Sequence, residues 1–157
     1  SANRPPTYPV NKTSEKTIHL EQVELAVPDA RGLYQPVTAE TPVLAPGETL
    51  RVYLYWEALE SEIAERTVSV RLSAADGFLL DQQDQLPAQG YRPMSWWEEG
   101  MQVRDIYYLT VPEETAGQIG SLDITLYDTY TQETIPFDGQ DEIMELLSVE
   151  IIDKRAP

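Results

Sequence analysis

The sequence contains no cysteine and only one histidine, and these shortages exclude several kinds of chemistry. Without cysteine the chain can form no disulfide, thiolate zinc site, iron–sulfur cluster or thiol nucleophile. His19 is the one imidazole, and no G-x-S-x-G nucleophile elbow accompanies it. Neither a Walker A loop nor a G-x-G-x-x-G fingerprint is present. We therefore expect a domain without catalytic activity of its own.

Basic residues are also scarce, since 11 Lys and Arg stand against 27 Asp and Glu and give a formal net charge of −16. Contact with phosphate backbones needs concentrated positive charge, so nucleic acid is an unsuitable partner. An anionic membrane surface is disfavoured for the same reason. The sequence lacks a run of about 18 apolar residues, so we expect no segment inserted into a membrane.

Short apolar stretches with a period of two, each bounded by turn residues, run through the chain from residue 17 onward. This alternation is typical of half-buried strands. Seven or eight such strands predict an all-β fold, a two-sheet antiparallel β-sandwich of immunoglobulin-like or jelly-roll-like type. The residues expected to fill the core between the sheets are Val52, Leu54, Trp56, Val68, Val70, Leu72, Leu122, Ile124 and Leu126.

The chain length fits one domain, which we place at residues 17–153. Residues 1–16 contain three prolines among polar side chains, which predicts a flexible Pro-rich arm or linker. In the first predicted strand the alternation slips near Gln22, and a β-bulge is one way to absorb the slip. The pair Asp76-Gly77 is a strong signal for a hairpin turn.

The long connection 86–101 carries two of the three tryptophans. Loops of this length within compact domains are often functional. Because exposed aromatic rings can stack on the C–H faces of sugars, Tyr91, Trp96 and Trp97 are candidate contact residues for carbohydrate. The alternative is that the tryptophans close one end of the core, and the sequence leaves open which of the two is buried.

Asp105 interrupts the apolar face of the predicted strand 102–111. A buried carboxylate needs a partner, and Arg92 or Arg71 is expected to reach it. Arg92 and Asp105 therefore join the candidate ligand-binding residues. The alternative is a structural role, in which Asp105 forms an ion pair or a backbone cap that ties the long loop to the sheet.

Acidic residues are abundant enough that some pair of carboxylates will always lie close together, so the count alone says nothing about hydrolysis. Asp138, Asp141 and Glu142 share one loop and are the candidates for a calcium site. Their spacing does not match the EF-hand pattern. We therefore expect no metal and no other cofactor, with calcium at this loop as the alternative.

An ordered series of turn and strand motifs carries a resemblance to a known family over roughly residues 17–152. The motifs are Pro46-Gly47-Glu48-Thr49-Leu50, Leu54-Tyr55-Trp56, Asp76-Gly77, the segment 91–97, Gly100, Val103-Arg104-Asp105 and Leu126-Tyr127-Asp128. The sequence resembles the C-terminal β-sandwich domain of multi-spanning membrane glycosyltransferase-like proteins of Chloroflexi-type bacteria. It departs from that pattern at Thr125 and Gln132, where the family usually has glycine.

The resemblance implies an extracytoplasmic domain, membrane-associated through a parent chain or secreted. It implies an accessory or binding role beside a membrane enzyme, with carbohydrate or the parent enzyme as partner. The alternative function is that of a structural cell-surface domain of immunoglobulin-like type that mediates protein–protein contacts. The sequence upstream of Ser1 would separate the two, because many apolar segments there would favour the membrane enzyme.

Overall fold

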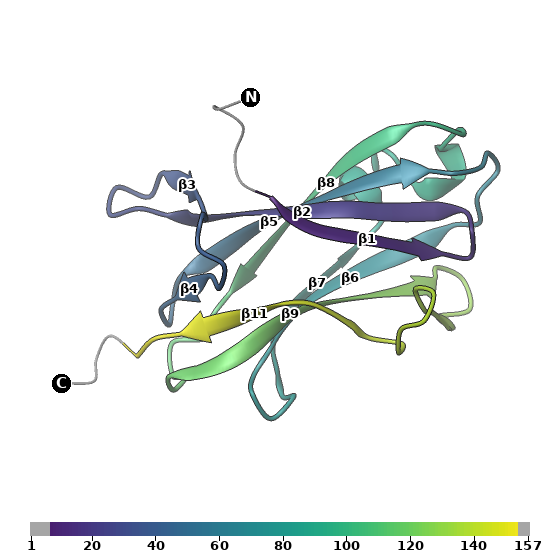
Figure 1. The fold of residues 1–157 in the computed structure, drawn as a ribbon. Coiled ribbons are helices and arrows are strands. Elements are labelled where there is room, and N and C mark those ends of the chain that lie inside the picture. Colours follow the sequence, from purple (N-terminus) through teal and green to yellow (C-terminus); the bar gives the residue numbers. More distant parts are fainter. Residues whose placement is uncertain (1–6, 154–157) are drawn as a thin grey trace.

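The computed structural model describes residues 7–153, which fold into two facing β-sheets (Figure 1). One sheet has the order β1-β2-β5-β8, with β3 also paired to β2. The other has the order β4-β11-β9-β6-β7, with β10 also paired to β9. The strands of the first sheet are β1 (Tyr8–Ser14), β2 (Ile18–Pro28), β3 (Tyr34–Pro36), β5 (Thr49–Ala58) and β8 (Gln102–Thr110). Those of the second are β4 (Val43–Leu44), β6 (Arg66–Ser73), β7 (Leu79–Gln85), β9 (Gln118–Asp128), β10 (Thr134–Ile135) and β11 (Met144–Ile151).

The sandwich prediction is confirmed, and the strand pairs described are antiparallel except for β4 with β11. All nine residues expected in the core are buried, each no more than 1% exposed. In this core the Trp56 ring stacks on Phe137 with 6.2 Å between ring centroids. Period-2 alternation located this core correctly because each sheet buries one face against the other.

The flexible arm expected at 1–16 is wrong for residues 8–14, which form β1 and pair with β2. Residues 1–6 of that arm lie outside the described residues. Short polar strands with prolines resemble linkers in sequence, and only the partner strand shows that their backbone groups are paired. The bulge expected near Gln22 is present, since the β2–β5 register shifts between Leu20 and Gln22.

Side chains from β7 cover the free edge of β8, so that the two sheets are joined along this side of the sandwich. The Thr110 amide donates to Asp81 Oδ2 at 2.7 Å, and the Tyr108 amide donates to Gln83 Oε1 at 2.8 Å. Gln85 Nε2 donates to the Ile106 carbonyl at 2.9 Å. This two-residue repeat satisfies backbone groups that a bare edge would offer to another chain.

The connection between β7 and β8 contains two short 3₁₀ helices, η1 (Pro87–Gly90) and η2 (Met94–Trp96). It gathers with the turn after β9 at the same end of the sandwich, on the right in Figure 1. Within residues 7–153 the structure contains no helix with the length and apolar character needed to cross a bilayer.

Candidate functional site

The two adjacent tryptophans of the β7–β8 connection have opposite surroundings. Trp97 is 1% exposed, lies 6.3 Å from the Trp56 ring and donates from Nε1 to the Arg92 carbonyl at 2.8 Å. Trp96 is 67% exposed and Tyr91 is 79% exposed. Trp97 is therefore part of the core, and its ring is not available to a ligand. Trp96 and Tyr91 remain candidate contact residues.

The expectation that an arginine neutralises Asp105 is wrong. Asp105 is fully buried, and its Oδ1 accepts hydrogen bonds from the Ala88 amide at 2.7 Å and from Gln85 Nε2 at 3.1 Å. Its Oδ2 accepts the Tyr107 hydroxyl proton at 2.5 Å. Four donors in all, counting the Ile106 amide, replace the expected guanidinium. Neutral donors suffice because each carboxylate oxygen can accept more than one hydrogen bond.

Asp105 therefore ties the β7–β8 connection to β8, which is the structural alternative that the sequence left open. Burial raises the pKa of this carboxyl, while its hydrogen bonds act in the opposite direction. The residue that it caps, Ala88, has a left-handed backbone with φ of 54°, and so does Gln89 with φ of 56°. Such backbone is costly outside glycine and persists where the surroundings fix it. Because the carboxylate is fully enclosed, Asp105 positions the loop and is not placed to contact a ligand.

The remaining sequence candidates are spread apart or engaged in structural contacts. Asp138, Asp141 and Glu142 are exposed, and the described residues contain no group of three or more carboxylate or imidazole side chains placed to hold a metal ion. His19 Nδ1 lies 2.8 Å from Thr13 Oγ1, so the imidazole connects β2 to β1. Arg92 is exposed on the loop and is not among the hydrogen-bond donors to the Asp105 carboxylate.

On the outer face of the first sheet, arginines separate the tyrosines that the alternation places there. The Arg51 and Arg104 guanidinium carbons each lie 4.7 Å from the Tyr53 ring centroid, and Arg51 also lies 5.0 Å from Tyr34. Tyr55 donates to a Glu24 carboxylate oxygen at 3.2 Å. These side chains pack on one another across strands, so this face offers no bare aromatic platform, although the buried Arg51 Nε has no hydrogen-bond partner among the described residues.

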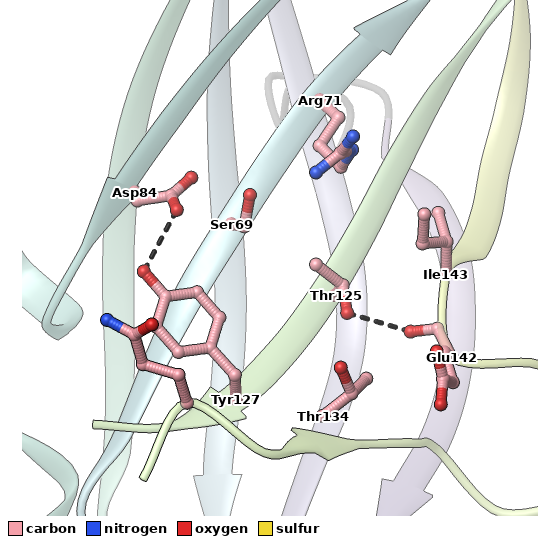
Figure 2. Close-up of a pocket in the computed structure, with 9 residues that line it drawn as sticks. Ser69, Arg71, Asp84, Thr125, Tyr127, Thr134, Glu142 and Ile143 are labelled. Atoms are coloured by element: carbon pink, nitrogen blue, oxygen red, sulfur yellow. Dashed lines mark hydrogen bonds between the residues drawn. The ribbon is translucent and has the colours of Figure 1, made fainter. Parts of the chain in front are cut away.

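A groove that the sequence did not indicate crosses the outer face of the second sheet (Figure 2). Its floor comes from β6, β7 and β9, and its far wall comes from β10 and the residues just before β11. The volume is about 420 Å³. The lining is mostly polar and consists of Ser69, Arg71, Asp84, Thr125, Tyr127, Gln132, Thr134, Glu142 and Ile143.

Hydrogen bonds hold both sides of this groove in place. Tyr127 donates its hydroxyl proton to Asp84 Oδ2 at 2.9 Å, and Thr125 Oγ1 donates to the Glu142 carbonyl at 2.8 Å (Figure 2). Burial, followed by the contact with Asp84, raises the pKa of the Tyr127 phenol. The phenol therefore stays protonated at neutral pH, and the ring is fixed as one side of the groove.

Two polar groups in the groove have unused hydrogen-bonding capacity. Ser69 is 1% exposed, and its Oγ has no hydrogen-bond partner among the described residues. Arg71 takes part in none of the ion pairs of residues 7–153, and its guanidinium points into the same space (Figure 2). Buried polar atoms are rarely left unpaired, so such an atom beside a groove marks a place for a ligand or water.

Chemically, the groove offers hydroxyl, guanidinium, carboxylate and amide groups beside one aromatic ring. In this set the Tyr127 hydroxyl faces the Asp84 carboxylate, but the raised pKa of the phenol disfavours its ionised, nucleophilic form. Alternation had placed Ser69 and Arg71 on the outer face. Nothing local in the sequence indicates that residues 132–134 and 142–143 form a wall beside them, because that wall comes from a distant part of the chain.

The fold and groove define the class of protein: a two-sheet β-sandwich with an open polar groove on one outer face. The C-terminal domain of wzt has a similar structure, with a TM-score of 0.51 at 12% identity over 98% of this chain and 88% of that one. A family 123 glycoside hydrolase from Clostridium perfringens, solved in work on glycolipid glycan hydrolysis, matches at a TM-score of 0.40 and 10% identity. That match covers 74% of this chain and 23% of the hydrolase.

No family model matches the sequence, and no curated protein matches it. The structural similarity to the C-terminal domain of wzt therefore establishes the fold alone. The resemblance to the sandwich domains of membrane glycosyltransferase-like proteins stays a prediction, as does the extracytoplasmic location that it implies.

Proposed function

We propose that the chain is a non-catalytic carbohydrate-binding domain and that the groove of the second sheet holds the sugar. The observation that carries the proposal is that, among the described residues, Ser69 Oγ has no hydrogen-bond partner and Arg71 no ion-pair partner, and that both line the groove with the fixed Tyr127 ring. A sugar presents hydroxyls that donate and accept, together with C–H faces that pack on aromatic rings. The groove supplies a partner for each of these features.

The structural similarity to the C-terminal domain of wzt is compatible with a role as one domain of a larger protein. The motif resemblance supports placing the domain outside the cell, attached to or acting beside a membrane enzyme that transfers sugars. In this proposal the enzyme performs the chemistry, and the sandwich holds the carbohydrate chain or contacts the enzyme itself. The high net negative charge is compatible with this role, since neutral sugars need no cationic surface.

The test is binding of the wild-type domain and of Arg71→Gln to a glycan array of bacterial cell-surface saccharides. Removing the guanidinium removes charged hydrogen-bond donors, so we expect affinity to fall about tenfold. Arg31→Gln is the matched control, because Arg31 is exposed and pairs with Asp29 at 3.5 Å in the turn after β2. Circular dichroism checks that each variant is folded.

Wild-type protein that binds no glycan on the array, or Arg71→Gln protein that binds as tightly as wild type, would contradict the proposal. In the first case a role in protein–protein contacts becomes the better explanation of the fold.

A further inference from the structure

Two exposed aromatic side chains lie at the end of the sandwich where β6 begins and β9 ends. Trp96, in η2, is 67% exposed, and Tyr130, in the turn that follows β9, is 83% exposed. Large aromatic rings lose favourable burial when they face water, and contiguous exposed apolar groups often mark interaction sites. The question is whether these two rings belong to one surface.

Glu65 contacts both of the backbone segments that present these rings. Its carboxylate accepts hydrogen bonds from the Ser95 hydroxyl at 2.5 Å and from the Ser95 amide at 3.4 Å, next to Trp96. Its backbone carbonyl accepts from the Thr129 amide at 3.5 Å, next to Tyr130. One residue therefore fixes the relative placement of the backbone on either side.

The turn that carries Tyr130 is rigidly held. Asp128 Oδ1 accepts from the amides of Tyr130 at 2.9 Å and Thr131 at 2.8 Å. These two hydrogen bonds, the largest causes, lower the pKa of Asp128. Its Oδ2 accepts from Arg66 Nη1 at 2.9 Å. A ring on such a fixed turn loses little freedom on binding, which favours affinity.

The same turn also borders the groove. Tyr127 precedes it and Gln132 lies within it, and both line the groove. Tyr130 is only three residues from Tyr127, a separation of at most about 11 Å between Cα atoms. The backbone turn that presents Tyr130 therefore continues directly from the lining of the groove.

We propose that Trp96 and Tyr130 form a stacking surface at the open end of the groove, so that the domain binds an oligosaccharide long enough to occupy both. The inference rests on the proposed function and deepens it. Arg71 and Ser69 hold one sugar in the groove, and further sugars of the same chain stack on the two exposed rings. Affinity then grows with chain length until both regions are filled.

The experiment measures binding of wild type, Trp96→Ala, Tyr130→Ala and Arg71→Gln to arrayed neutral and acidic oligosaccharides in homologous series of increasing length. For the series that binds wild type, we expect long members to bind about tenfold more tightly than short ones. Trp96→Ala and Tyr130→Ala should lose that gain while keeping the affinity for short members. Arg71→Gln should lose affinity for short and long members alike.

Phe78→Ala is the matched control, because Phe78 is 72% exposed and lies after β6, at the opposite end of the sandwich. It should bind every member as wild type does. The inference is overturned if affinity does not depend on length, or if both aromatic variants keep the full gain while Arg71→Gln loses binding. In these cases the groove proposal stands alone. If no series binds wild type, both proposals fail.

Discussion

At the scale of single residues, Asp105 is a buried polar group on which the hydrogen bonding of its neighbours depends. Its carboxylate accepts from two backbone amides, one side-chain amide and one phenol, which belong to the end of β7, the start of the long loop and β8. Removing it would leave several donors buried without an acceptor, which costs about 1–3 kcal/mol for each unsatisfied group. It therefore acts as a positioning residue for the loop.

We predict a pH-dependent stability contribution from Asp105. Burial raises its pKa in the folded state above the unfolded value, so the folded protein holds this proton more tightly. The stabilisation is complete below the unfolded pKa of about 3.9 and is lost as pH rises through the folded pKa. Asp105→Asn has no proton to lose, so the free energy of unfolding of wild type relative to this variant should fall as pH rises from about 4.

Urea unfolding of both proteins across a pH series measures the difference. All other titratable groups are common to the two proteins, so their contributions cancel. A difference that is constant with pH, or that grows toward neutral pH, would show that the folded pKa is not raised.

At the scale of elements, the β7–β8 connection buries one of its two adjacent tryptophans and exposes the other. Pro93 and Met94 are buried together with Trp97, whereas Ser95 and Trp96 face solvent. The short η2 helix makes this split possible, because at about three residues per turn Met94 and Trp97 face the same side, whereas Ser95 and Trp96 face other directions. One element thus closes the core and presents a ring to solvent.

We predict that the two adjacent tryptophans differ strongly in their effect on stability. Trp97→Ala removes the ring that packs on Trp56 and the hydrogen bond to Arg92, and it should cost about 3–5 kcal/mol. Trp96→Ala removes an exposed ring and should change the free energy of unfolding by about 0.5 kcal/mol or less. Chemical denaturation of the two variants gives the comparison. Similar losses for both variants would mean that Trp96 is packed in solution.

At the scale of the whole molecule, the formal net charge of −16 acts against compaction. Only three ion pairs connect side chains within residues 7–153, and two of them share Arg66. Acidic side chains therefore repel one another without much local compensation. The sandwich core must outweigh this repulsion.

We predict that moderate salt stabilises the protein. Raising NaCl from about 0.01 M to about 0.15 M shortens the Debye length from about 30 Å to about 8 Å and screens the repulsion between distant carboxylates. A gain of about 1 kcal/mol, or roughly 3 °C in Tm, is expected for a domain of this size. Thermal unfolding followed by circular dichroism measures it, with KCl as the check against an effect of one ion. A Tm that is unchanged or lowered would contradict the expectation.

The sequence by itself determined the sandwich, the core and which face of each strand is buried. These depend on alternation within a single strand, as in β5, where Leu54 and Trp56 point inward and Tyr53 outward. Turn residues such as Asp76-Gly77 marked the connections because turn geometry is also local.

The tertiary structure alone decided what pairs with what across the chain. It gave β1 its partner, replaced the expected arginine at Asp105 with neutral donors, and sent Trp97 inward and Trp96 outward. It also brought residues 132–143 beside Ser69 and Arg71 to make the groove. None of this is visible in local patterns, because the free energy of each of these contacts depends on residues distant in the sequence.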